Sequence, residues 1–273
     1  MDLLELIIDD RIVRVAPGTS VLAAASQAGV NIPTLCHLAG LSPSGACRMC
    51  VVQIDGMKSL AAACSLPVSA GMIVHTHTPA VLEARRMVLE LLLANHPADC
   101  FSCSRNLNCE LQELAAELGV KKVRFAGERR RYPLDDSNPF IVRDNEKCIL
   151  CGRCVRACQE LQVCNVLDFT GRGFDTKLAP AFDTITSESD CVFCGACVAA
   201  CPVGALTEKA LCQSGRPDKK VRTTCPFCGV GCNFDLNVKD GKVIGVTSAP
   251  DSPVNSRLLC VKGRFGIDFI HSP

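Results

Sequence analysis

Cysteine is the residue type in this chain that could do chemistry, because 21 of the 273 residues are cysteines and most of them are clustered. An odd number of cysteines in tight clusters argues against a disulfide framework and favours metal-binding thiolates. Nineteen of them, together with His96, form five groups of four. The groups are Cys36, Cys47, Cys50 and Cys64; His96, Cys100, Cys103 and Cys109; Cys148, Cys151, Cys154 and Cys158; Cys191, Cys194, Cys197 and Cys201; and Cys225, Cys228, Cys232 and Cys260.

The third and fourth groups form an internal repeat. Residues 147–158 and 190–201 are identical at 7 of 12 positions, and both contain the spacing C-x2-C-x2-C-x3-C. This is the run of bacterial two-cluster ferredoxins, in which the fourth cysteine of each run binds the other cluster. The spacing therefore predicts two [4Fe–4S] clusters, and two zinc ribbons are the alternative. The predicted ligand sets are Cys148, Cys151, Cys154 and Cys201 for one cluster, and Cys191, Cys194, Cys197 and Cys158 for the other.

The remaining groups are less generic. The first lies on loops of a small domain and favours a [2Fe–2S] cluster, with zinc as the alternative. In the second group three cysteines need a fourth ligand, and His96 precedes the first of them by four residues, so we predict a [4Fe–4S] cluster. A plain helix-end histidine is the alternative there. The spacing of the fifth group, taken by itself, is the most typical of zinc. The presence of the other cluster-binding groups in the same chain favours a fourth [4Fe–4S] cluster there. Cys164 and Cys212 are predicted to be small buried hydrophobic side chains.

Composition and charge exclude several classes of function. The 29 basic and 28 acidic residues give a net charge of +1, which attracts neither nucleic acid nor anionic lipid. No secretory signal or membrane span is visible, so a reducing, cytoplasmic compartment is expected.

No dinucleotide or phosphate-binding glycine motif occurs, and no catalytic triad is free of the clusters, so we expect no catalytic residues. His75, His77 and the run Arg129–Arg131 are expected to be solvated.

Hydrophobic patterns and turn residues predict the elements that position these groups. An α+β class is expected, with polar linkers at 126–139 and 213–220. Strands are expected at 3–8, 11–15, 50–54, 59–64, 72–77, 234–238 and 242–246, and helices at about 20–28, 79–95 and 109–118. The predicted domains are 1–78 (β-grasp [2Fe–2S] ferredoxin-like), 79–125 (helical, with one His and three Cys ligands), 140–210 (two [4Fe–4S] clusters) and 222–273 (a further [4Fe–4S] domain).

The order of these groups resembles the N-terminal region of the large iron–sulfur subunit of respiratory complex I and of iron-only hydrogenases. Three further runs make the resemblance more specific to one family. They are Thr223–Cys232 (TTCPFCGVGC), Cys260–Arg264 (CVKGR) and Arg172-Gly173-Phe174. The whole chain is similar to the N-terminal third of the α subunit of NAD-dependent, molybdenum- or tungsten-containing formate dehydrogenases. In that family a molybdopterin domain follows, and Lys262 matches the lysine between cluster and pterin.

The resemblance implies a function and partners. We expect an electron-transfer subunit of an NAD(H)-linked oxidoreductase, relaying single electrons between a flavin- and NAD(H)-binding subunit and a ferredoxin or further redox subunit. A small [2Fe–2S] subunit is a further expected partner. The alternative is the N-terminal part of a catalytic formate dehydrogenase whose molybdopterin domain is absent from this chain. A zinc scaffold without a redox role is the third class, which the cubane spacing disfavours.

Overall fold

The computed structural model describes residues 3–272, apart from the side chain of Gln213. The chain forms two compact units. The first consists of residues 1–96 and 110–129, and the second of residues 97–109 and 130–273. The chain therefore leaves the first unit after His96, returns to it at Glu110 and leaves it again after Arg129.

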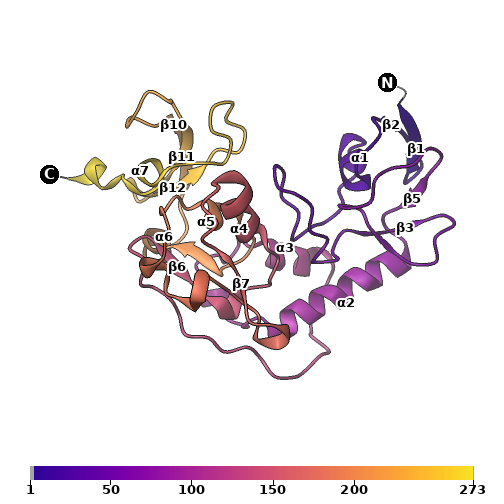
Figure 1. The fold of residues 1–273 in the computed structure, drawn as a ribbon, viewed down its shortest axis with the longest axis horizontal. Helices are drawn as coiled ribbons and strands as arrows, with labels where there is room; N and C mark the ends of the chain where they lie inside the picture. The colour runs from indigo at the N-terminus through magenta and orange to yellow at the C-terminus, as the bar shows by residue number, and fades with distance from the viewer. Residues whose placement is uncertain (1–2, 273) are drawn as a thin grey trace. The chain divides into compact units, whose positions relative to one another are not determined.

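A five-stranded sheet with three helices makes up the described part of the first unit (Figure 1). The strand order is β2-β1-β5-β3-β4, in which only the β1–β5 pair is parallel. The elements are β1 (Leu4–Ile8), β2 (Arg11–Val15), α1 (Val21–Gln27), β3 (Val51–Ile54), β4 (Ala61–Ala62), β5 (Ile73–His75), α2 (Pro79–Asn95) and α3 (Glu110–Glu117).

The first hairpin forms where the sequence predicts it. Asp9 and Asp10 both adopt positive φ angles (44° and 66°), as a two-residue turn between twisted strands requires. The alternating residues Leu6 and Ile8 of β1 and Val13 and Val15 of β2 then point into one aliphatic core. Strands β3, β4 and β5 are shorter than predicted, because backbone pairing covers only two to four residues in each.

Helix α2 begins as predicted, with Thr78 as N-cap and Pro79 at the first position. The fully buried Arg85 fastens the helix to the sheet, since its guanidinium donates to the carbonyl oxygen of Val51 at 2.9 Å. The neighbouring Arg86 donates to the carbonyl of Leu118 at 3.0 Å, just after α3. These two arginines thus hold the sheet, α2 and α3 together.

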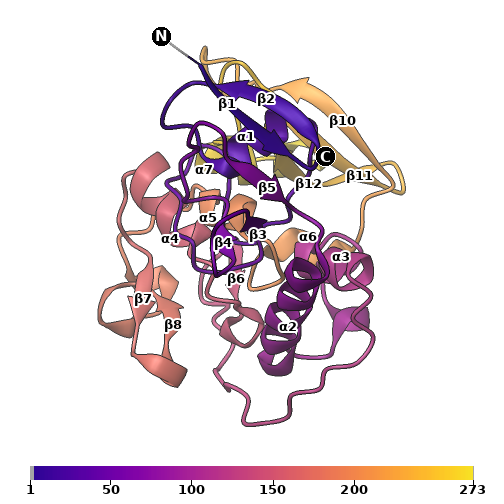
Figure 2. The ribbon, with the colours of Figure 1, turned by 90° about the vertical axis from the view of Figure 1, so that its right-hand side faces the viewer.

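The second unit contains three small sheets and short helices. The three sheets are the pair β6-β9, the hairpin β7-β8 and the antiparallel sheet β10-β11-β12. Figure 2 shows the β7-β8 hairpin on the opposite side of this unit from β10–β12. The elements are β6 (Ile141–Arg143), α4 (Arg153–Arg156), β7 (Asp168–Thr170), β8 (Lys177–Ala179), α5 (Ala196–Ala200), β9 (Leu206–Glu208), α6 (Lys209–Ser214), β10 (Lys219–Thr224), β11 (Asn233–Lys239), β12 (Lys242–Ser248) and α7 (Val261–Phe265).

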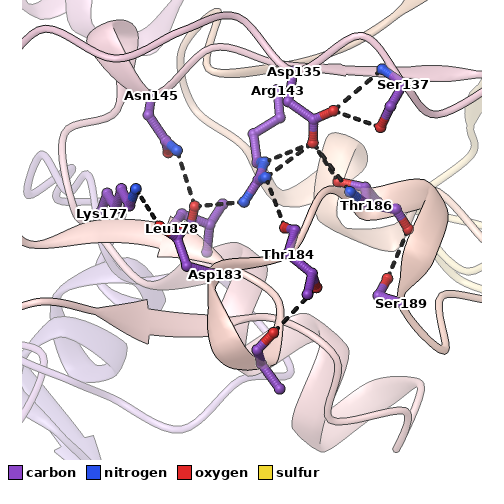
Figure 3. Close-up of polar contacts among 11 residues, drawn as sticks. Asp135, Ser137, Arg143, Asn145, Lys177, Leu178, Asp183, Thr184, Thr186 and Ser189 are labelled. Carbon is purple, nitrogen blue, oxygen red and sulfur yellow. Dashed lines mark hydrogen bonds and ion pairs between the residues drawn. The ribbon is translucent and has the colours of Figure 1, made fainter.

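The expectation of a plain linker at 126–139 was wrong at its C-terminal end. Asp135 is half-buried, with its side chain 9% exposed, and it accepts hydrogen bonds from Arg143 (2.9 Å), Thr186 and Ser137 (Figure 3). Burial favours a raised pKa for Asp135, but the hydrogen bonds from Ser137 and Thr186 outweigh it and lower the pKa to about 2. Asn138 is buried and caps the start of β6 through the N–H of Ile141.

Three further expectations need correction. The predicted linker 213–220 contains the end of α6 and the start of β10. Arg130 is not merely solvated, because it donates to the carbonyl of Cys148 at 3.3 Å. The strand expected at 72–77 ends at His75 and does not reach His77; His75 Nε2 lies 3.1 Å from the Asp55 carboxylate, and His77 Nδ1, on an exposed side chain, lies 3.6 Å from that of Asp9. Among the described residues, no helix combines the length and apolar character that crossing a membrane requires.

Candidate metal centres

The first cysteine group lies on the connection between α1 and β3 and just after β4. Cys36 follows α1, Cys47 and Cys50 precede β3, and Cys64 follows β4. A hydrogen bond from the Cys47 thiol, with the backbone N–H groups of Cys47 and Ala46, lowers the pKa of Cys36 to about 4. Burial, together with Cys64 and Cys36, raises the pKa of Cys50 to about 11. The four sulfur atoms therefore form one interacting, largely buried group.

The second group falls on both sides of the division of the chain. His96 is the C-terminal cap of α2 in the first unit. Cys100, Cys103 and Cys109 lie on the segment 97–109 of the second unit, where Cys100 begins a short 3₁₀ turn. Within that unit a Cβ atom on Gly204 would lie 2.7 Å from the Cys103 sulfur, so glycine permits this close approach.

The third and fourth groups are brought together crosswise. Burial raises the pKa of Cys154 well above its usual value, and nearby thiolates raise it further. The strongest of these neighbours are Cys148, Cys151 and Cys201, of which Cys201 belongs to the other run. Burial likewise raises the pKa of Cys197, and the nearby Cys194, Cys191 and Cys158 raise it further. Each run of three sulfur atoms therefore lies within electrostatic range of the fourth cysteine of the opposite run, and Cys158 lines one small cavity with Cys191, Cys194 and Cys197.

The loops of the two repeats share one backbone geometry. Leu150 and Phe193 occupy the same position between the first and second cysteines, and both have a φ of 52°. Gly152 and Gly195 follow the second cysteine with a φ of 70° in both repeats. These left-handed residues turn backbone N–H groups toward sulfur: the N–H of Leu150 lies 3.4 Å from the Cys148 sulfur. Such N–H donors orient ligands and tune the potential of a cluster.

The fifth group is gathered by the sheet β10–β12 and the segment before α7. The N–H of Cys225 donates to the carbonyl of Cys232 at 2.8 Å. Burial raises the pKa of Cys232, and Cys225, Cys228 and Cys260 add to the rise. Asn255, which sequence reasoning missed, ties the segment that carries Cys260 to β11, because its amide donates to the carbonyls of Asn233 (3.1 Å) and Leu258 (2.8 Å).

The donor chemistry of these groups suits iron–sulfur clusters. Four soft sulfur donors lie together in most groups, and backbone N–H groups point at some of the sulfur atoms. All 21 cysteines are free thiols. In the described part of the chain, no three His, Cys, Asp or Glu side chains are arranged to hold a single metal ion.

The two leftover cysteines and Lys262 have distinct surroundings. Cys212 was expected to be buried but is exposed, and its thiol lies 3.2 Å from the hydroxyl of Thr207. Cys164 is half-buried, and with Cys158 and Cys191 it lines a small apolar cavity. Lys262 lies on α7 with its side chain exposed.

Comparison with family models identifies the kinds of domain present. The chain matches a 2Fe-2S iron-sulfur cluster binding domain at residues 2–79 and the NADH-ubiquinone oxidoreductase-G iron-sulfur binding region at 85–124. It also matches a 4Fe-4S dicluster domain at 147–205 and the molybdopterin oxidoreductase Fe4S4 domain at 218–272. The chain is therefore a multi-domain iron–sulfur protein of mixed α and β structure, with domains for both types of cluster.

Known proteins resemble the chain along most of its length. It is 38% identical to an NADH-quinone oxidoreductase subunit of Rhizobium meliloti (strain 1021), over 99% of this chain and 32% of that protein. It is 37% identical to NADP-reducing hydrogenase subunit HndD of Solidesulfovibrio fructosivorans, over 99% of this chain and 46% of that protein. A crystal structure of NAD+-reducing [NiFe]-hydrogenase in the H2-reduced state superposes with a TM-score of 0.67 and 32% identity, covering 76% of this chain and 88% of that one.

These matches define the family. The chain belongs to the family of the matched chain of NAD+-reducing [NiFe]-hydrogenase, and it is like the N-terminal iron–sulfur region of NADH-quinone oxidoreductase and NAD(P)-reducing hydrogenase subunits. The expected resemblance to complex I and hydrogenase subunits is thereby confirmed. The molybdopterin oxidoreductase Fe4S4 match is consistent with the formate dehydrogenase-like side of the resemblance. The chain spans 32% of the length of the first curated relatives that it matches.

Proposed function

We propose that this chain is the electron-transfer iron–sulfur part of a cytoplasmic, NAD(P)H-linked, multi-subunit oxidoreductase. The observation that carries the proposal is the crosswise grouping of the two cysteine runs, in which Cys201 lies near the first run and Cys158 lies near the second. That arrangement belongs to proteins that hold two clusters side by side. The names of the relatives, which are subunits of NADH, NADPH and hydrogenase systems, support the link to nicotinamide nucleotides.

The proposed cofactors are one [2Fe–2S] and four [4Fe–4S] clusters. Bound clusters of this kind accept and donate single electrons. The chain's own residues supply the ligands, exclude water through burial and direct N–H groups at sulfur. The proposed sets are Cys36, Cys47, Cys50 and Cys64; His96, Cys100, Cys103 and Cys109; Cys148, Cys151, Cys154 and Cys201; Cys191, Cys194, Cys197 and Cys158; and Cys225, Cys228, Cys232 and Cys260.

The proposed domain boundaries are those drawn from the sequence, with a β-grasp domain at 1–78. The sheet order β2-β1-β5-β3-β4 with one parallel pair supports that interpretation. The proposed partners are a flavin- and NAD(H)-binding subunit, a small [2Fe–2S] subunit, and a ferredoxin or further redox subunit. The chain itself would contribute conduction and no catalytic residue.

A second candidate function is the N-terminal part of a catalytic, NAD-dependent formate dehydrogenase. The molybdopterin oxidoreductase Fe4S4 match at 218–272 favours it. Formate-dependent reduction of NAD by the complex purified from cells separates the two functions. We expect no formate oxidation by this chain reconstituted with iron and sulfide alone, and measurable turnover there would contradict the conduction role.

The test of the first function is a cluster count with electron uptake. The chain, reconstituted under anaerobic conditions, should bind about 18 iron atoms and give electron paramagnetic resonance (EPR) signals of both cluster types upon reduction. Bound zinc in place of iron, or clearly fewer than five clusters, would contradict it.

A separate experiment tests the His96 ligand. Neutral imidazole makes a cluster less negative than a thiolate does, which raises its potential. His96→Cys should therefore keep a [4Fe–4S] cluster with a lower potential, and His96→Ala should lose or alter that cluster's signal. The matched control is His75→Ala, which removes a histidine of the sheet outside every proposed ligand set. If His96→Ala behaves like this control, another residue is the ligand.

A further inference from the structure

The two repeats differ in arginine content at matching positions. In the first repeat, Arg156 lies on α4 and its guanidinium donates to the carbonyl oxygen of Cys151, the second cysteine, at 3.4 Å. The second repeat carries alanine at the matching position, Ala199, and alanine again at position 196 where the first repeat has Arg153. The second repeat therefore has no arginine of its own to place on the carbonyl of Cys194.

An arginine from a distant part of the chain occupies that place. Arg264 lies on α7, and its Nε donates to the carbonyl oxygen of Cys194 at 3.2 Å. Cys194 is the second cysteine of its repeat, so this bond matches the bond of Arg156 to Cys151. The approach depends on Gly195, because a Cβ atom there would overlap Cδ of Arg264 and lie 2.6 Å from its Nε.

An aromatic ring follows the same pattern. In the first repeat a Cβ atom on Gly152 would lie 3.6 Å from the ring of Phe169, which belongs to the β7-β8 hairpin. In the second repeat a Cβ atom on Gly195 would lie 3.2 Å from the ring of Phe265, next to Arg264. Phe265 also stacks on Phe140 with the ring centroids 4.6 Å apart. One arginine and one phenylalanine therefore pack close to the glycine of each repeat, Gly152 in the first and Gly195 in the second.

Arg264 is buried in a network that joins several strands. It is 2% exposed, and its Nη1 donates at 3.0 Å to the carboxylate of Glu208, which is 4% exposed and ends β9. Its Nη2 donates to the hydroxyl of Ser248 at the end of β12, at 2.7 Å. Salt screens a buried, fully hydrogen-bonded ion pair only weakly. The charges of Arg264 and Glu208 therefore act on the groups close to them with little screening.

We propose that Arg264 is a positioning residue that completes the second repeat and raises the reduction potential of the cluster held by Cys191, Cys194, Cys197 and Cys158. This rests on the ligand sets of the proposed function. A positive charge beside a cluster stabilises its reduced, more negative state, and hydrogen bonds around the ligands act in the same direction. The C-terminal segment therefore adjusts a cluster to which it contributes no ligand.

The experiment is an EPR-monitored redox titration of the full chain with all clusters reconstituted. The double variant Glu208→Gln/Arg264→Gln removes both charges, so no unpaired carboxylate stays buried. We expect the reduction equilibrium constant of one of the two repeat clusters to fall about tenfold, which is about 59 mV for a one-electron couple. Arg264→Lys keeps the charge but loses the planar fork, so a smaller fall of about threefold is expected.

Two matched variants define the comparison. Arg156→Gln should lower the potential of the other repeat cluster, which identifies each signal. Arg222→Gln removes an exposed arginine of the C-terminal segment, paired with Asp235 and Asp251, and should shift neither cluster. If Arg264→Lys and the double variant both leave the potentials unchanged, or if Arg222→Gln shifts them equally, the proposal is wrong. Failure of the unaltered chain to bind two repeat clusters would instead contradict the proposed ligand sets.

Discussion

The two units of the chain are stabilised by different kinds of interior. The first unit buries one continuous aliphatic core, in which strand residues such as Leu6, Ile8 and Val74 are 1% exposed or less. The second unit also buries apolar side chains such as Leu178 and Val203, but many of its buried side chains are charged or amides, among them Arg143, Glu208, Asn237 and Arg264. At its C-terminal sheet, the described residues Cys225, Phe234, Val246 and Leu259 form a small buried cluster.

This difference follows from the size of the pieces. A sheet of five strands with packed helices can cover an aliphatic core, whereas short segments around cysteine ligands cannot bury enough apolar surface. Metal ligands and hydrogen-bonded charges then take over the cross-linking, because ligand binding and folding are coupled in such modules. The sheet of the first unit should therefore be independent of its cluster, and the second unit should not.

Removing the clusters should have the largest effect on this comparison. Chelation of iron under anaerobic conditions should lower the hydrogen-exchange protection of β11 by roughly two orders of magnitude or more, since the binding free energy is also folding free energy. Amides of β1 and β5 in the first unit should keep most of their protection. Equal loss in both units would show that the first unit also depends on its cluster.

Breaking a buried charge pair should have the next largest effect, confined to the second unit. Asp135→Asn leaves the buried guanidinium of Arg143 without its carboxylate, which costs about 3–5 kcal/mol in comparable buried pairs. The opening free energy of β6 amides, measured by native-state hydrogen exchange, should fall by that amount. The control Asp251→Asn removes one partner of the exposed Arg222 and should change it by less than about 1 kcal/mol. A result no larger than the control would mean that the network in Figure 3 does not stabilise this unit.

A core truncation tests the aliphatic interior of the first unit. Val74 on β5 is fully buried, and Val74→Ala should cost about 2 kcal/mol through lost transfer free energy and a cavity. The matched control in the same sheet is Ile12→Ala, because Ile12 is 68% exposed and its truncation should cost about 0.5 kcal/mol or less. Hydrogen exchange of β1 amides measures both. Equal costs at the two positions would contradict a packed core.

Local sequence signals predicted the first unit well. The first hairpin and the helices α1 and α2 lie close to their expected ranges, because the Asp9-Asp10 turn, the Ser20 cap of α1 and the Thr78-Pro79 start of α2 each involve residues within a few positions of one another. The strand lengths were overestimated, because an apolar run does not show where its partner strand ends. The crosswise pairing of the cysteine runs stays a prediction at the level of ligands, although the dicluster match supports the type of domain.

The second unit shows what the sequence could not reveal. Asp135 lies in a polar run that is typical of a linker, yet it accepts a hydrogen bond from Thr186, 51 residues further on. Arg264 meets the carbonyl of Cys194 across 70 residues. The sequence signal for the contact of Arg264 was Ala199, which stands where the other repeat has Arg156. This difference can be interpreted only when the structure shows which arginine takes the place of the missing one.

The smallest predicted effect concerns the start of α2, which joins the sheet to the helical part of the first unit. The hydroxyl of Thr78 accepts from the N–H of Val81 at 3.3 Å and donates to the side-chain oxygen of Gln53 at 2.8 Å. Thr78→Ala removes both bonds and should cost about 1 kcal/mol, as the loss of an N-cap does. Thr78→Ser keeps the oxygen and should restore most of it. Hydrogen exchange of the first turns of α2 measures the effect, and a serine variant as weak as the alanine variant would show that the methyl group of Thr78, and not the cap, holds the helix to the sheet.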